Sequence, residues 1–222
     1  MPTPDATKRK FQNAFITQVL VLAGLLFAAV ITAATMGYIA IPPSDVLKII
    51  AAALSGDPGM MAGVDELFPV VVLDIRLPRI LAATLVGSGL AMSGAVFQGI
   101  LLNPLADPYT LGVSAGAAFG ASVAILLNLG FLGTYSIPMF AFCGAVATLF
   151  FVIYLSASGE GLSSNNLILS GIIVAAILSA GISFMKYLAD EQVGVIIFWL
   201  MGSFGSKTWV DVGLAFAFVV FG

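Results

Sequence analysis

Residues 76–127 read RLPRILAATLVGSGLAMSGAVFQGILLNPLADPYTLGVSAGAAFGASVAILL, and this stretch decides the fold. Two apolar segments flank the polar turn NPLADP, which predicts two membrane-spanning helices joined by a short loop. Small residues recur at every fourth position on both helices: Gly87, Ala91 and Ala95 on the first, and Gly112, Gly116 and Gly120 on the second. In lipid, helices associate where small side chains let their backbones approach. One such stripe arises often by chance in glycine-rich helices, but two stripes beside one loop favour helix packing.

The composition indicates an integral membrane protein. Of 222 residues, 60% are hydrophobic and 9% are charged, whereas soluble domains carry about 25% charged residues. The chain has no histidine and a single cysteine, Cys143, so a disulfide framework is excluded and neither a zinc site, a haem site nor another cofactor is expected. We expect Cys143 to be a small core residue. Lys8–Lys10 is the one basic run, so no nucleic-acid partner is predicted.

The apolar runs predict an all-α, polytopic helical bundle with about six transmembrane helices. Residues 1–15 form a polar, basic tail, and residues 16–222 form the transmembrane domain. The predicted spans cover residues 16–38, 78–98, 111–127, 134–156, 166–189 and 209–222. Proline suits a first helical turn, so Pro78 is taken as the start of the second span. Between the first two spans, Ser44–Leu54 predicts a short capped helix, and the apolar segment Val193–Met201 is too short to cross.

The first span is long enough to be an uncleaved helix. A cleavable signal peptide is the alternative, but its apolar core covers only about 7–15 residues. The basic tail places the N-terminus in the cytoplasm of the cell, with the chain in the inner (plasma) membrane. The other basic residues do not support this orientation, since Lys48, Arg76, Arg79, Lys186 and Lys207 then fall outside.

The charges argue against a self-powered transporter. No predicted span carries an ionisable residue in its middle, although transporters driven by protons or sodium usually need one, or an unwound polar site at the membrane midplane. The segment GSFGSKT, residues 202–208, superficially resembles a phosphate-binding loop. It follows no strand, and Ser206 precedes Lys207 where that loop requires glycine. We therefore expect no nucleotide site and no catalytic residue in this chain.

Arg76 and Arg79 have two interpretations. In the first, they are interfacial side chains at the start of a helix, with Asp74 as a local partner. The residues alone favour this interpretation. Alternatively, they form an outward-facing pair of cations that receives acidic residues of a docking protein.

The stretch RLPRILAATLVGSGLAMSGAVFQGILLNPLADPYTLGVSAGAAFGA, with NLILSGI and FWLMGSFGSKTW further on, closely resembles a known family. It is the FecCD-type permease subunit of ABC importers for iron–siderophore complexes, haem and cobalamin. The resemblance covers residues 69–222. It implies ten-helix permeases that pair as homodimers, with the substrate path at the dimer interface, two cytoplasmic ATP-binding subunits below and a substrate-binding protein outside.

The resemblance also assigns roles to residues. It implies that Arg76 and Arg79 receive the binding protein, which reverses the preference stated above. It implies a cytoplasmic gate at the turn Asn103–Leu105, with Asn103 and Leu105 as its residues, and at the linker residues Ser164 and Asn165. It implies that residues 167–188 line the path.

Six of ten helices are then present, so the chain is expected to be a fragment or a truncated protein. The family's connection to the ATPase would lie beyond Gly222. Two alternatives remain open: a secondary transporter or channel that ATP does not drive, and a membrane scaffold without transport.

Overall fold

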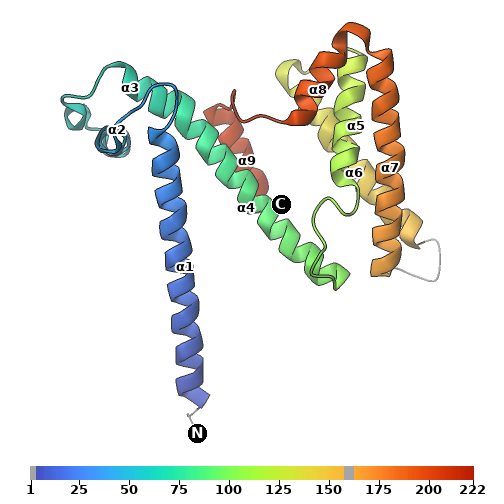
Figure 1. Cartoon of the computed structure of the whole chain (residues 1–222), viewed down its shortest axis with the longest axis horizontal. Coiled ribbons are helices and arrows are strands. Elements are labelled where there is room, and N and C mark those ends of the chain that lie inside the picture. Colours follow the sequence, from blue (N-terminus) through green and yellow to red (C-terminus); the bar gives the residue numbers. More distant parts are fainter. Residues whose placement is uncertain (1–3, 158–162) are drawn as a thin grey trace. The chain divides into compact units, whose positions relative to one another are not determined.

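The computed structural model describes residues 4–157 and 163–222, and all the regular secondary structure in these residues is helical (Figure 1). The α-helices are α1 (Pro4–Thr35), α2 (Pro43–Ser55), α3 (Leu67–Val70), α4 (Leu77–Leu101), α5 (Val113–Leu126), α6 (Ser136–Ala157), α7 (Ser164–Leu188), α8 (Val193–Met201) and α9 (Trp209–Phe221). Short 3-10 turns are η1 (Pro58–Met61), η3 (Gly133–Tyr135) and η4 (Asp190–Gln192), and η2 (Val71–Arg76) is a π-helix. The predicted fold class is therefore confirmed.

Four helical stretches in the described residues are long and apolar enough to cross a membrane. They are Gln12–Thr35, Leu67–Leu101, Gly133–Ala157 and Ser164–Leu188. Two predicted spans are helical as α5, with 14 residues, and α9, with 13. At about 1.5 Å per residue α5 measures roughly 20 Å, less than the hydrocarbon thickness of about 30 Å.

The first helix begins earlier than the sequence analysis predicted. α1 starts at Pro4, so most of the predicted tail is helical, and residues 1–3 lie outside the described part. Pro4 suits a first turn because its missing N–H is not needed there, and no glycine or proline interrupts the next nineteen residues. The helix ends at Thr35, before Gly37, rather than at Tyr38.

The second helix runs through Pro78 instead of starting at it, so the interval between the first two predicted spans is helical from Leu67 onward. Helical structure is continuous from Leu67 to Leu101. Proline lacks an N–H and its ring crowds the carbonyl group four residues earlier. The chain accommodates this by widening to a π-helix directly before Pro78, where the Leu77 N–H donates to the carbonyl oxygen of Val72.

The chain divides into two compact units, Met1–Val86 with Phe204–Gly222, and Gly87–Ser203. The core of the first unit forms where α2 packs against the end of α1 and against η2. Its buried side chains are Ala34, Ile41, Val46, Ile49 and Val72. The predicted short helix is confirmed as α2, whose buried residues Val46, Ile49 and Ala52 lie at helical spacing, and Gly56 ends it in the left-handed conformation at φ 70°.

The second unit is built around α5, which packs against α6, α7 and α8 (Figure 1). Two small cores hold it together. One contains Leu111, Val152 and Val174. The other contains Ile125, Ala189 and Ile196, the last of these from the predicted short helix α8, which is confirmed at Val193–Met201.

Candidate functional site

Arg76, one of the two arginines predicted to receive a docking protein, is buried in the first unit. Only 9% of its surface is exposed. Its Nη1 donates to the carbonyl oxygen of Ala34 at 2.6 Å, and its Nη2 donates to the carbonyl oxygen of Ile39. The side chain thus joins the last turn of α1 to the connection before α2. Backbone carbonyl groups therefore accept from both terminal nitrogen atoms of the Arg76 guanidinium.

The lack of a side chain at Gly37 leaves room for the guanidinium of Arg76. A Cβ atom at residue 37 would lie 2.8 Å from Nη2 of Arg76, well inside van der Waals contact. A side chain at this position would therefore displace the guanidinium. The sequence signal for this contact was the glycine itself, directly after the predicted first span.

Arg79 is exposed, one helical turn after Arg76. Among the residues described, the one ion pair within 4.0 Å joins Lys48 to Asp45, so Asp74 is not the predicted partner of either arginine. Arg79 lies at an open hollow of about 540 Å³, here called the arginine hollow. Its lining comes from α1, the following connection, η2 and α4: Ala33, Met36, Gly37, Tyr38, Ile39, Val71, Ile75, Arg76, Arg79 and Ile80.

The π-helix also receives α9. The Nε1–H of Trp209 donates to the carbonyl oxygen of Leu73 at 3.1 Å. That carbonyl is free to accept because the Leu77 N–H reaches Val72 instead and Pro78 has no N–H. This contact was not predicted from the sequence, in which Pro78 was the available signal.

The turn after α4 is fixed by its own side chains. The Asn103 side chain accepts from the Leu105 N–H at 2.9 Å, and Nε2 of Gln98 donates to the carbonyl oxygen of Pro104 at 3.0 Å. Oδ1 of Asp107 accepts from the N–H groups of Tyr109 and Thr110, and from the Thr110 hydroxyl. Leu105 is 87% exposed, so the turn presents an apolar side chain on a rigid backbone.

This turn is packed onto α7. A Cβ atom at Gly171 would overlap the carbonyl oxygen of Thr110 and lie 2.8 Å from Cα of Leu111. Gly112, in the left-handed conformation at φ 73°, packs from the other side, where a Cβ atom would lie 3.0 Å from the carbonyl oxygen of Gly171. Residues 110–112, which follow the predicted gate turn Asn103–Leu105, therefore touch α7 backbone to backbone.

Ser164 and Asn165, predicted in a linker, lie in the first turn of α7, whose N-cap is Ser163. The Ser163 hydroxyl accepts from the Asn166 N–H at 3.2 Å, which is the capping pattern that starts a helix. Ser164 is half-buried and Asn165 is exposed. Much of the predicted linker, residues 158–162, lies outside the described residues.

The two predicted small-residue stripes differ in their surroundings. Gly87, Ala91 and Ala95 are exposed, and a Cβ atom at Gly87 would have open space. Gly116 and Gly120 face α6: a Cβ atom at Gly116 would lie 2.6 Å from the carbonyl oxygen of Gly144, and one at Gly120 would overlap the carbonyl oxygen of Phe140. Gly144, which the stripes did not include, supplies the complementary surface on α6.

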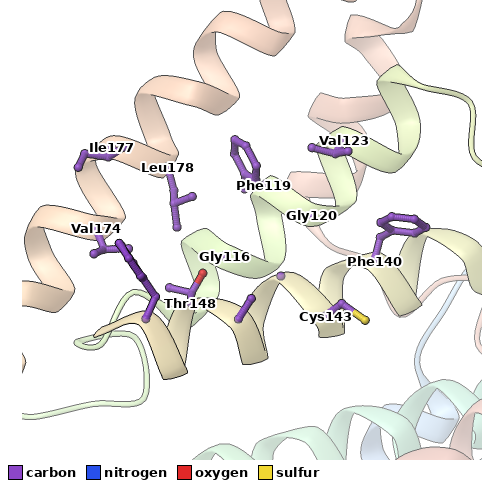
Figure 2. Close-up of a pocket in the computed structure, with 13 residues that line it drawn as sticks. Gly116, Phe119, Gly120, Val123, Phe140, Cys143, Thr148, Val174, Ile177 and Leu178 are labelled. Atoms are coloured by element: carbon purple, nitrogen blue, oxygen red, sulfur yellow. The ribbon is translucent and has the colours of Figure 1, made fainter. Parts of the chain in front are cut away.

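A groove of about 480 Å³ follows α5 between α6 and α7, here called the glycine groove (Figure 2). Figure 2 shows Thr148 of α6 beside Gly116, and Phe119 and Leu178 between α5 and α7. The lining is almost wholly apolar, so the groove offers packing surface rather than polar ligands. Cys143 lines it and is exposed, which corrects its prediction as a core residue.

The described residues contain no cluster of three or more His, Cys, Asp or Glu side chains that could hold a metal ion. Two structural features of the described residues are available for contact with a partner protein. The first unit offers the exposed cation Arg79 beside the arginine hollow, and the second offers close-packed helices with a hydrogen-bonded turn.

Comparison with known proteins identifies relatives along nearly the whole chain. The model of the FecCD transport family matches residues 11–222. YvrB, an ABC transporter permease protein of Bacillus subtilis, is 34% identical over 97% of this chain and 62% of its own length. The Fe(3+)-citrate import system permease protein YfmE of the same organism is 32% identical over 94% of this chain and 58% of its own length.

One further relative and one solved structure also match the chain. The cobalamin import system permease protein BtuC of Halobacterium salinarum is 39% identical over 72% of this chain and 43% of its own length. A solved structure, described as an inward-facing conformation of a metal-chelate type ABC transporter, is 30% identical with a TM-score of 0.74, over 92% of this chain and 59% of that one. The chain thus spans about two fifths to three fifths of the length of these relatives.

Proposed function

Because the chain belongs to the FecCD transport family of ABC permeases, we propose that it forms part of the translocation path of an importer for metal chelates of the iron–siderophore, haem or cobalamin class. The observation that carries the proposal is the family match over residues 11–222. Relatives named for Fe(3+)-citrate and cobalamin import support the chelate class. A relative from Haemophilus influenzae named for molybdate import leaves an oxyanion as the competing cargo.

The proposed permease works without a catalytic residue of its own. Two ATP-binding subunits on the cytoplasmic side drive the cycle, a substrate-binding protein delivers the cargo from outside, and a second copy of the permease completes the path. The helices of this chain alternate between outward- and inward-open packing. The close backbone contacts of α5, α6 and α7 support movement as rigid bodies, since packed helices rearrange as units rather than deform.

Docking of the binding protein is proposed at Arg79. This side chain is exposed and has no ion pair within 4.0 Å among the described residues. A carboxylate on the partner would therefore gain a charge-assisted hydrogen bond without displacing another acid. Asn103, Leu105, Ser164 and Asn165 are proposed as residues of the cytoplasmic gate.

The proposed gate has support from geometry within the second unit. Thr110 and Leu111 pack against Gly171 on α7, the helix whose first turn holds Ser164 and Asn165. A shift of α7 would therefore carry the end of the turn with it.

Transport tests the function directly. The full-length permease is reconstituted in liposomes with the ATP-binding subunits and the binding protein encoded beside it, and uptake of ferric citrate, cobalamin and molybdate is measured. Uptake of a chelate that requires ATP and all subunits is expected. Uptake that follows an ion gradient without the ATP-binding subunits would overturn the proposal, and uptake of molybdate alone would overturn the chelate class.

The inner-membrane location and cytoplasmic N-terminus are tested by labelling. Single cysteines at Ser44 and at Asn165, in a Cys143→Ser background, are treated in intact cells with a thiol reagent that does not cross membranes. The position at Ser44 is expected to react and the one at Asn165 to be protected. The opposite pattern would contradict the orientation.

A further inference from the structure

We propose that α2 is an interfacial helix, which lies at the membrane surface and presents one of its faces to lipid. This face, here called the lipid face, consists of Leu47, Ile50 and Leu54. Its occupant is the bilayer itself, at the boundary between the headgroups and the hydrocarbon. The inference goes beyond the proposed function, because it concerns how the first unit is held in the membrane and applies whatever the cargo is.

The residues of α2 divide into three faces, each with helical spacing. One face is buried in the core, one is polar and exposed, and one is apolar and mostly exposed. Their residues are Val46, Ile49 and Ala52; Ser44, Lys48 and Ser55; and Leu47, Ile50 and Leu54. A helix that met only protein and water would need just the first two faces.

The lipid face is exposed although it is apolar. Leu54 is 86% exposed and Leu47 is 48% exposed, and Ile50 is only partly buried, at the edge of the core cluster. Contact of these side chains with water is unfavourable in proportion to their apolar area. An apolar medium beside the helix removes this area from water and therefore stabilises α2.

The packing of α2 sets its level relative to the membrane. α2 packs against the end of α1 and against α3 and η2 (Figure 1). In the core that α2 completes, Ala34 lies next to the end of the apolar stretch Gln12–Thr35, and Val72 lies near the start of Leu67–Leu101. Both stretches are long and apolar enough to cross a membrane. α2 is therefore held where two spans meet the membrane surface.

The apolar surface of α1 continues onto α2. Leu22, Leu25 and Phe27 of α1 are more than 60% exposed, so this span presents apolar side chains to lipid. Ile50 packs against the cluster that contains Ala34 of α1, so the lipid face begins where that surface ends. Tyr38, in the connection between the two helices, is fully exposed, and tyrosine favours the headgroup level. This continuity identifies lipid as the occupant.

The length and the polar face of α2 fit the same position. With 13 residues, α2 measures about 20 Å and is too short to cross the hydrocarbon. An interfacial helix buries its apolar face about 5–10 Å into the boundary and keeps its polar face in water. α2 combines these two faces with a third that packs on protein, so it anchors the first unit at the surface.

Spin labels on the two exposed faces test the inference. Leu47→Cys and Leu54→Cys probe the lipid face, and Ser44→Cys and Lys48→Cys probe the polar face, each in the full-length permease with its other cysteines changed to serine. Leu20→Cys is the lipid reference, since this side chain is 66% exposed in the middle of α1. Each labelled protein is placed in phosphatidylcholine nanodiscs. Its relaxation by oxygen, which concentrates in the bilayer, is compared with its relaxation by a water-soluble nickel chelate.

We expect the ratio of oxygen to nickel accessibility to be about threefold or more higher on the lipid face than on the polar face, and to approach the ratio at Leu20→Cys. Equal ratios on the two faces would overturn the inference. A ratio at Leu47→Cys and Leu54→Cys that favours nickel would also overturn it, because water would then cover the face. Low accessibility to both reagents there would overturn it as well, because a second copy or another segment of protein would then cover the face.

Hydrogen exchange of the α2 amides gives a second measurement that needs no label. The double variant Leu47→Gln with Leu54→Gln makes the lipid face polar, and Lys48→Gln is the matched control on the polar face. Leucine, lysine and glutamine have similar helix propensities, so the comparison isolates the contact with lipid. Faster exchange in nanodiscs is expected in the double variant alone, and unchanged exchange there would overturn the inference. Neither measurement uses a cargo or an ATP-binding subunit, so failure of the proposed function would leave both results unaffected.

Discussion

The carbonyl oxygen of Gly116 on α5 occupies the space that a Cβ atom at Gly144 on α6 would need. The relationship is reciprocal, since a Cβ atom at Gly116 would lie 2.6 Å from the carbonyl oxygen of Gly144. Two backbones therefore meet where both helices lack side chains. This close approach is the way in which helices gain packing energy in lipid, where burial of apolar surface gives none.

Gly144→Ala is expected to destabilise the second unit by about 1–3 kcal/mol, the usual cost of forcing an extra methyl group into a packed contact. The obstacle is a backbone atom that cannot rotate away. The fraction folded is measured by circular dichroism during titration with SDS in mixed micelles. Gly99→Ala is the control: a Cβ atom there has nothing within 4 Å, and alanine favours a helix over glycine by roughly 1 kcal/mol. Equal stability of the two variants would contradict the packing argument.

Gly171→Ala is expected to disrupt the packing of residues 110–112 against α7. Its Cβ atom would overlap the carbonyl oxygen of Thr110, so we expect faster amide exchange at Thr110 and Gly112, together with reduced transport by the full-length protein. Gly194→Ala, on α8, has open space around its Cβ atom and is expected to change neither. Unchanged exchange at Thr110 in Gly171→Ala would show that the turn does not depend on α7.

Asp107→Ala removes the acceptor that organises the second half of the turn. Three donors lose the carboxylate, namely the Tyr109 N–H, the Thr110 N–H and the Thr110 hydroxyl, and of these the Thr110 N–H keeps the backbone carbonyl oxygen of residue 107. Because these groups are exposed and water can replace the carboxylate, the local stability of the turn is expected to fall by about 1 kcal/mol. The fall is measured as faster hydrogen exchange of the two amides. Glu191→Ala, an exposed acid outside the turn, serves as the control. Protection that persists in Asp107→Ala would mean that the backbone alone holds the turn.

Trp209→Phe removes the hydrogen bond from α9 to the π-helix. The ring is largely retained, and the carbonyl oxygen of Leu73 loses its 3.1 Å donor. We expect a loss of about 0.5–1.5 kcal/mol for this single bond, measured by circular dichroism in the same titration. Trp199→Phe on α8 controls for the loss of an indole group. A larger loss in Trp199→Phe than in Trp209→Phe would contradict the importance of this contact.

The exposed apolar surface of the transmembrane helices was largely predictable. A low content of charged residues and long apolar runs determine that the chain is a helical membrane protein, because backbone groups in lipid must bond within the segment. The residues 76–127 were enough to indicate the family. The short helices α2 and α8 were also predicted, since their lengths and end signals are local properties.

Local pattern failed where one residue has two possible meanings. Pro78 is compatible with the start of a helix and with its interior. It lies in the interior when helical packing of the preceding residues stabilises the fold by more free energy than the missing hydrogen bond costs. Val72 is buried against α1 and α2, which favours the continuous helix. The π-helix is the result, and the hydrophobic periodicity of the sequence does not predict it.

The sequence by itself determined the membrane class and the family, because hydropathy and motif residues are properties of the chain alone. Only the tertiary structure decided which partner each position meets. It separated two arginines that are one helical turn apart, burying Arg76 against the carbonyl groups of Ala34 and Ile39 and leaving Arg79 exposed. The physical reason is that the acceptors of Arg76 lie 42 and 37 residues away along the chain, and folding alone brings them within reach.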